Sequence, residues 1–273
     1  MKWVRGLAHL NSLQNRIAQW DAGGHVWAEL VLDKSEKHVD SILRIDAPPP
    51  LAEMSLLLGD AVHNMRSALD ALVWELCHLD GKIAAKPTLV KFPAARTKAE
   101  WRTTAGHLRT MPVPFLDRVH AFQPYLADVP NSTLIGLLAD MSNQDKHRGM
   151  IAASAEASSL ALEFSINQDD LGQSTPEGAI DGISFTPAGD NFRDLTDQNP
   201  YFGINTSARI SLTRERVPVQ IGYTIGVEGV SYDLAAVIVA LTSMHTTLYQ
   251  LCGLADMPSS AELQSGERPA GDA

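Results

Sequence analysis

Apolar residues recur every three or four positions through much of the first half of the chain and again near its end. This spacing predicts amphipathic helices, because it places the apolar side chains on one face of a 3.6-residue period. The longest such stretch begins after Pro48-Pro49-Pro50, and Asn131-Ser132-Thr133 offers N-cap residues for a later one. The predicted helices cover residues 4–21, 51–78, 97–109, 112–123, 133–148 and 232–252.

Strict alternation of apolar and polar residues appears in other stretches and predicts half-buried strands. Residues 25–45 form a predicted hairpin around Lys34–Lys37, and residues 160–166 form a further strand. The clearest alternation runs from Val217 to Val227, and we expect residues 208–227 to form an antiparallel hairpin. Residues 168–200 are rich in Asp, Gly, Asn and Pro and are expected to be loops.

These elements predict an α+β fold. Its helical core contains two long motif-bearing helices, and its antiparallel sheet comes mainly from the second half together with the N-terminal hairpin. We expect one domain over 1–255, with a helix-rich part at 1–150, a β-rich part at 151–230 and a C-terminal helix at 231–253. The polar tail at 256–273 is expected to be disordered.

The formal net charge of −10 disfavours non-specific binding of nucleic acid, which is itself a polyanion. The longest apolar run, residues 234–241, is shorter than the roughly 20 residues that cross a bilayer, so we expect no membrane association. The N-terminus lacks the features of a signal peptide, and the two cysteines lack metal-ligand spacing. We therefore expect a cytoplasmic protein without a cofactor. Its partners are unknown, and a homodimer is possible.

The helix predicted at 51–78 has an unusual polar face. On a helical wheel its apolar side chains, such as Val62 and Met65, form a core stripe, while His63, Arg66 and Asp70 lie close together on the opposite side. Solvent-facing helix surfaces are commonly filled with Lys, Glu and Gln, and this face has none of them between Asp60 and Trp74. A face packed against other protein through hydrogen bonds is therefore favoured over one open to solvent.

The helix predicted at 133–148 ends with a second polar group. Asp145 and Arg148 continue its buried stripe, although charged residues are rarely buried without partners. Either the helix ends near Gln144, or these residues pair as Asp145–Arg66 and Arg148–Asp70. His245, on the apolar stripe of the last helix, is expected to be a hydrogen-bonded core residue. The candidate site comprises His63, Arg66, Asp70, Asn143, Asp145, Lys146, His147 and Arg148.

These two segments resemble a family of uncharacterised bacterial proteins with a GD-x-x-HN-L-R-x-A-LD motif and a later N-x-DKHR motif after a QPY segment. The resemblance covers roughly residues 50–150, and the family has no established activity. Similar sequences often have His where this chain has Ala71. The matching residues are Gly59, Asp60, His63, Asn64, Arg66, Ala68, Leu69, Asp70, Phe92-Pro93, Gln123-Pro124-Tyr125, Asn143 and Asp145 to Arg148.

A helical core with Arg, Asn and His at helix ends is also similar to the HEPN superfamily. Many of its members are ribonucleases or toxin components built on an R-x4–6-H motif. Arg102 and His107 have this spacing, within a stretch interrupted by Gly106, and Asn143 with His147 resembles the second half of the motif.

Three functions remain open. The first is a binding or regulatory module, in which the cluster is a buried polar network between the two helices. The second is metal-independent RNA cleavage, with His147 or His63 as general acid or base and Arg66 or Lys146 stabilising charge on phosphate. The third is a metal-dependent hydrolase, for which the candidate ligands are Asp60, His63, Asp140 and His147.

Overall fold

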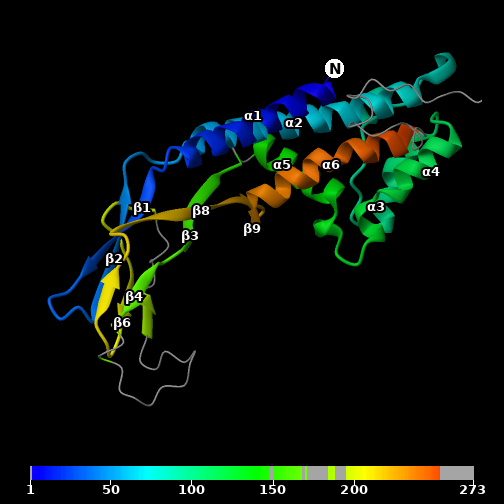
Figure 1. Cartoon of the computed structure of the whole chain (residues 1–273). Helices are drawn as coiled ribbons and strands as arrows, with labels where there is room; N and C mark the ends of the chain where they lie inside the picture. Colours follow the sequence, from blue (N-terminus) through cyan, green and yellow to red (C-terminus); the bar gives the residue numbers. More distant parts are fainter. Residues whose placement is uncertain (1, 148–150, 168–169, 171–183, 188–194, 253–273) are drawn as a thin grey trace, which may run out of the picture. The chain divides into compact units, whose positions relative to one another are not determined.

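The computed structural model describes residues 2–147, 151–167, 170, 184–187 and 195–252, and these have the predicted α+β fold (Figure 1). The described residues fall into two compact units. The helical unit contains residues 2–10, 58–147 and 236–252, and the β-rich unit is formed by described residues within 11–57 and 151–235. A single domain at 1–255 stays a prediction. The tail at 256–273 lies outside the described residues.

Each predicted helix is present among the described residues, with ends within a few residues of those expected. The long helix α2 begins directly after the three prolines, and Met54 donates its backbone N–H to the carbonyl of Pro50. Short 3-10 turns connect several of the helices. The α-helices are α1 (Lys2–Ala22), α2 (Leu51–Cys77), α3 (Lys98–Ala105), α4 (Val113–Ala121), α5 (Leu134–His147) and α6 (Leu234–Cys252).

The helical unit has a core of aliphatic and methionine side chains, as the wheel of α2 predicts. The N-terminal part of α1 packs closely on α2, because a Cβ built at Gly6 would lie 2.8 Å from Cγ of Met65. Glycine at this position thus permits close approach of the two helices. Buried side chains in this unit include Val62, Met65, Leu69 and Val73 of α2, Leu138 and Met141 of α5, and Leu241 and Met244 of α6.

Helix α6 is, within the described residues, the one helix long and apolar enough to span a membrane by length and composition. Core helices pass the same test, and one face of α6 is buried through Val237, Ile238 and Leu241. His245 lies half-buried on this helix, with Nδ1 2.8 Å from the carbonyl oxygen of Thr242. The predicted hydrogen bond of His245 is therefore confirmed, although its burial is partial.

The β-rich unit is built around the N-terminal hairpin. Its main sheet has the strand order β3-β8-β1-β2-β6-β5, with β9 also paired to β8, so the predicted hairpin of β1 and β2 lies in the middle. The pairs β1–β2, β1–β8, β2–β6 and β3–β8 are all antiparallel. The strands are β1 (Val26–Leu32), β2 (His38–Ile45), β3 (Ala153–Leu160), β4 (Phe164–Ile166), β5 (Ser184–Pro187), β6 (Pro200–Asn205), β7 (Ile210–Leu212), β8 (Arg216–Val227) and β9 (Val230–Asp233).

The hairpin predicted at residues 208–227 is wrong. Strand β7 pairs with β4 in a separate two-stranded sheet, while β8 pairs with β1, β3 and β9. The hairpin that does form joins β8 to β9 through Glu228 and Gly229, whose φ angles of 51° and 81° suit a two-residue turn. Alternation identifies a strand and its buried face, but it does not specify the neighbouring strand.

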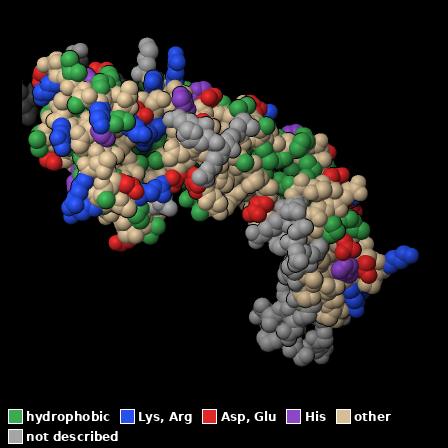
Figure 2. All heavy atoms as spheres, turned by 180° about the vertical axis from the view of Figure 1, so that it is seen from behind, with side chains coloured by type: hydrophobic (Ala, Val, Ile, Leu, Met, Phe, Trp, Pro, Cys, Tyr) green, Lys and Arg blue, Asp and Glu red, His purple; other side chains and the backbone are tan. Residues whose placement is uncertain are grey.

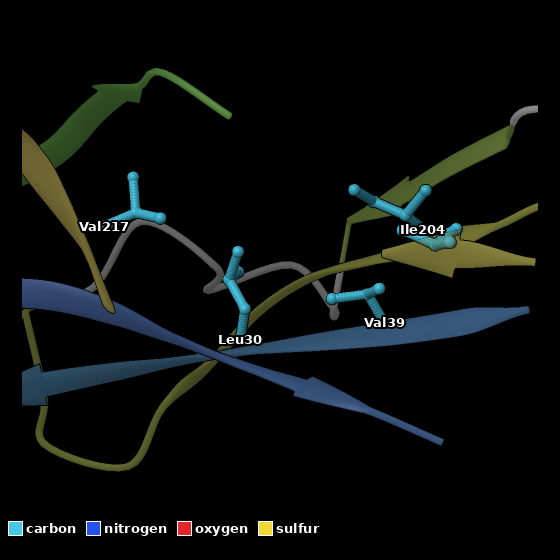
Figure 3. Close-up of a cluster of buried hydrophobic side chains, with 5 residues drawn as sticks. Leu30, Val39, Ile204 and Val217 are labelled. Atoms are coloured by element: carbon cyan, nitrogen blue, oxygen red, sulfur yellow. The ribbon is translucent and has the colours of Figure 1, made fainter. Parts of the chain in front are cut away.

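Five buried aliphatic residues from different strands form the core of the β-rich unit (Figure 3). They come from β1, β2, β6, β7 and β8, so this core joins strands that are far apart in the sequence. Partly buried residues such as Phe164 and Phe202 pack against it. The five residues are Leu30, Val39, Ile204, Ile210 and Val217.

Polar contacts hold the turn between β1 and β2. The Asp33 carboxylate accepts hydrogen bonds from the backbone N–H groups of Lys37 and His38, each at 3.1 Å. Nε2 of His38 lies 3.0 Å from Asp40, and Nδ1 lies 2.7 Å from Asn205 of β6. Hydrogen bonds to Asp40 and then to Asn205 raise the pKa of His38, because they favour the protonated ring.

We predict that NMR titration will place the pKa of His38 above its ordinary value of 6.5. Asp40→Asn should lower it, since Asp40 is the main cause of the shift. Because the folded-state pKa is raised, the stability contributed by His38 is fully present below its unfolded pKa. It is lost as the pH rises through the folded pKa. The effect on unfolding should be small, since the imidazole is 35% exposed. A pKa at or below 6.5 would contradict this account.

Candidate functional site

The polar face of α2 divides into an exposed part and a covered part. His63 is exposed, whereas the side chain of Arg66 is only 11% exposed and that of Asp70 is 34% exposed. The sequence correctly predicts that this face packs against protein at Arg66 and Asp70. It also predicts that His63 belongs to the same cluster, but no hydrogen bond or ion pair joins His63 to either residue within the described chain.

Arg66 and Asp70 together bind the peptide groups on both sides of one residue, Phe92. Nη2 of Arg66 donates to the carbonyl oxygen of Phe92, and Oδ1 of Asp70 accepts the backbone N–H of Phe92 at 2.9 Å. The two side chains also form an i,i+4 ion pair, with Nη2 3.4 Å from Oδ1. The ring of Phe92 is fully buried. One turn of α2 therefore fixes the backbone of a loop residue by both its donor and its acceptor.

The electrostatic environment of Arg66 is that of a buried cation. Burial lowers the pKa of its guanidinium, and the negative charge of Asp70 partly offsets that effect. Arginine remains protonated despite such shifts, so a positive charge is held inside the helical unit. Nη1 of Arg66 is buried and has no hydrogen-bond partner among the described residues. Arg66 therefore depends on Asp70 and on the Phe92 carbonyl for compensation.

Gln123 holds the segment that follows Phe92. Its amide nitrogen donates to the carbonyls of Pro93 and Val119, at 3.2 and 2.8 Å, and its oxygen accepts the backbone N–H of Ala95 at 2.9 Å. The side chain is almost completely buried and all of these contacts are satisfied. The glutamine of the QPY segment thus has a structural role, in fixing the loop that carries the Phe-Pro pair.

Neighbouring residues add two more attachments to this region. Arg96 forms an ion pair with Asp140 of α5, and the backbone N–H of Tyr125 donates to the carbonyl of Ala95 at 3.0 Å. His120 hydrogen-bonds to the hydroxyl of Tyr125 and stacks on Trp101, with ring centroids 4.8 Å apart. Residues 92–96, which we call the Phe92 segment, are therefore anchored by side chains from α2, α5 and the loop after α4.

Helix α5 meets α2 at Gly59, although not through the predicted ion pair. Oδ1 of Asp145 would lie 3.0 Å from a Cβ built at Gly59, so the carboxylate packs directly on the α2 backbone. The predicted Asp145–Arg66 pair is wrong, because the carboxylate that pairs with Arg66 belongs to Asp70. Thr133 caps α5 by accepting the backbone N–H of Gly136 at 3.1 Å, as its sequence predicts.

The remaining residues of the predicted site are only partly placed. Helix α5 continues through Lys146 and His147, so the alternative in which it ends near Gln144 is wrong. The side chains of Lys146 and His147, and the whole of Arg148, lie outside what the structure describes, and so does the predicted Arg148–Asp70 pair. Asn143 is exposed.

The proposed metal ligands are not gathered in the described part of the chain. Asp140 is occupied by Arg96, and His63 and Asp60 are exposed on α2. Among the described side chains, no group of three or more His, Cys, Asp or Glu residues is placed to hold a metal ion. The side chain of His147, the fourth candidate ligand, lies outside what the structure describes.

Two recesses were not predicted from the sequence. One, of about 270 Å³, lies in the helical unit and is lined by Gln123, Phe122, Leu126, Ile135 and Thr247. Gln123 therefore belongs both to the network around the Phe92 segment and to the wall of a mainly apolar recess.

The other recess, of about 360 Å³, lies in the β-rich unit and is lined by Trp20, Asp21 and His25 together with residues 218–221 of β8. Next to it, the hydroxyl of Tyr223 donates to Asp21 at 2.7 Å, and burial raises the pKa of that phenol. Neither recess has a local sequence signal, because each is assembled from distant segments.

The contact between Gly59 and Asp145 yields a stability prediction. Gly to Ala at helical backbone angles usually stabilises by about 0.4–1 kcal/mol, and Gly106→Ala should do so, since Gly106 follows α3 with φ −60° and nothing lies within 4 Å of its Cβ position. Gly59→Ala should stabilise the protein less than Gly106→Ala does, or destabilise it, because the Asp145 carboxylate must move. In an Asp145→Ala background, Gly59→Ala should stabilise the protein as much as Gly106→Ala does. Urea midpoints of the four variants test this, and equal gains at Gly59 in both backgrounds would contradict the contact.

No protein-family model, no curated protein and no solved structure matches this chain. The resemblances of the two motifs, to the uncharacterised bacterial family and to the HEPN superfamily, therefore stay predictions. What the chain does has to be inferred from the chemistry of its own residues.

Proposed function

We propose that this protein is a binding or regulatory module in which the Arg66–Asp70 pair has a structural role and does not take part in catalysis. The observation that carries this proposal is the attachment of both side chains to the backbone of Phe92. An arginine that stabilises phosphate in a reaction must be able to reach the substrate. Arg66 is only 11% exposed, and its Nη2 is used internally.

Two further features support a binding role. The Phe92 segment is held rigid by Gln123 and by the Arg96–Asp140 pair, and Gln123 also lines the 270 Å³ recess. Pre-organised concave surfaces lined by apolar side chains are typical of binding sites. We infer that the polar network stabilises this recess and the surface around it, which supports a binding role.

The structural role predicts a clear loss of stability. Arg66→Met should lower the free energy of unfolding by about 1–3 kcal/mol, because the buried Phe92 carbonyl loses its donor and Asp70 its counter-charge. Asp70→Asn keeps an acceptor for the N–H of Phe92 but removes the counter-charge of the buried Arg66, so it should also destabilise the protein. Arg16→Met serves as the control, because Arg16 forms an exposed ion pair with Glu53 and should contribute about 0–1 kcal/mol. Urea midpoints measure all three. A negligible effect of Arg66→Met would contradict the structural role.

An RNA-cleavage assay separates a binding module from a ribonuclease. Purified wild-type protein incubated with structured RNA, with and without EDTA, is expected to leave the RNA intact. Cleavage that His63→Ala or His147→Ala abolishes at unchanged stability would overturn the proposal in favour of RNA hydrolysis. Cleavage lost only in EDTA would instead indicate a metal-dependent hydrolase.

A further inference from the structure

The charge of the chain is distributed very unevenly. Residues 79–120 contain eight Lys or Arg and three Asp or Glu, which gives this segment a net charge of +5 in a chain whose total is −10. Figure 2 shows Lys and Arg side chains gathering over the end of the helical unit that carries α3 and α4. A single stretch of the sequence thus carries a net positive charge within an acidic protein, although it contains no continuous basic run.

The loop that follows α2, residues 79–91, combines this charge with exposed apolar side chains. Lys82, Lys86 and Lys91 are all exposed, and Asp80 is the only acidic residue among them. No ion pair joins any of these three lysines to a carboxylate in the part of the chain that the structure describes. As far as the described residues go, three cations therefore face outward without a carboxylate partner.

The apolar side chains of the same loop point away from the core. Ile83 is 79% exposed, and Leu79 and Leu89 are 38% and 41% exposed. Buried Ala84 and Val90 anchor the loop. Two 3-10 turns, at Leu79–Gly81 and Pro87–Leu89, fix its backbone. Single exposed apolar residues are common, but exposed apolar side chains grouped together indicate an interaction surface, and these three lie within one short loop.

We propose that the loop at residues 79–91 binds the surface of membranes that contain anionic phospholipids. Lysines interact with the negative headgroups, and neighbouring aliphatic side chains enter the boundary between headgroups and acyl chains. An RNA partner would use the lysines, but its bases bind mainly by stacking on aromatic or arginine side chains, and residues 79–91 contain neither. The acidic remainder of the protein does not prevent such contact, because charges beyond about 8–10 Å are screened at physiological salt. The contact is peripheral and needs no membrane-spanning helix. It therefore departs from the expectation of no membrane association, which was based only on the length of the apolar run at residues 234–241.

Co-sedimentation with phosphatidylcholine vesicles, with and without phosphatidylserine, tests the proposal. Wild-type protein should bind only the vesicles with phosphatidylserine, and more weakly as salt is added. Replacing Lys82, Lys86 and Lys91 together by Gln should lower the partition coefficient by about two orders of magnitude. The matched control replaces the exposed Lys2, Lys34 and Lys37 by Gln, which removes the same charge elsewhere and should change binding little.

The apolar contribution has its own pair of variants. Ile83→Ser should weaken vesicle binding roughly ten-fold, whereas Val239→Ser, at a 66% exposed position of α6, should leave it unchanged. All variants replace exposed side chains, so urea midpoints near that of the wild type will show that they fold. Equal binding to both vesicle types, no binding, or equal losses in the two lysine triples would overturn the proposal. Binding of single-stranded RNA through the same lysines, without vesicle binding, would assign the surface to nucleic acid instead.

Discussion

The helical unit depends on the way in which α2 holds the peptide groups of Phe92. Arg66 and Asp70, one turn apart on α2, supply a donor and an acceptor to a residue that belongs to no helix or strand. A buried loop must have its backbone polar groups satisfied, and here charged side chains satisfy them. The ion pair between the two residues also compensates the buried charge of Arg66. Loss of Arg66 would leave the carbonyl of Phe92 buried and unpaired, and loss of Asp70 would leave its N–H buried and unpaired.

Two further polar contacts of the unit lie next to this interaction. Once Phe92 is fixed, the following residues lie within reach of Gln123, and Arg96 reaches Asp140 on α5. The QPY and Phe-Pro segments are thus two sides of one network. The network accounts for the burial of several polar side chains without requiring any of them to react with a substrate, which is why a binding or regulatory role is favoured.

The sequence predicted what depends on local periodicity and failed where the answer depends on distant segments. The wheel of α2 separated the buried Val62 and Met65 from the polar face, and it singled out Arg66 and Asp70. It could not show that their partner is a backbone group, because Phe92 lies in an irregular loop and any residue supplies a peptide group. The Asp145–Arg66 pair was chosen by charge alone, whereas in the structure Asp145 packs on Gly59, a position with no side chain. Likewise, alternation located β7 and β8 but not their neighbours.

Hydrogen exchange at the amide of Phe92 tests the central claim most directly. Although this residue lies in a loop, its N–H is bound by a carboxylate inside the helical unit. It should therefore exchange as slowly as amides in the middle of α2, while that of the neighbouring, exposed Lys91 exchanges faster. Asp70→Ala should remove this protection. A Phe92 amide that exchanges as fast as an unstructured peptide in the wild-type protein would show that α2 does not hold this segment, and the account of the network would fail.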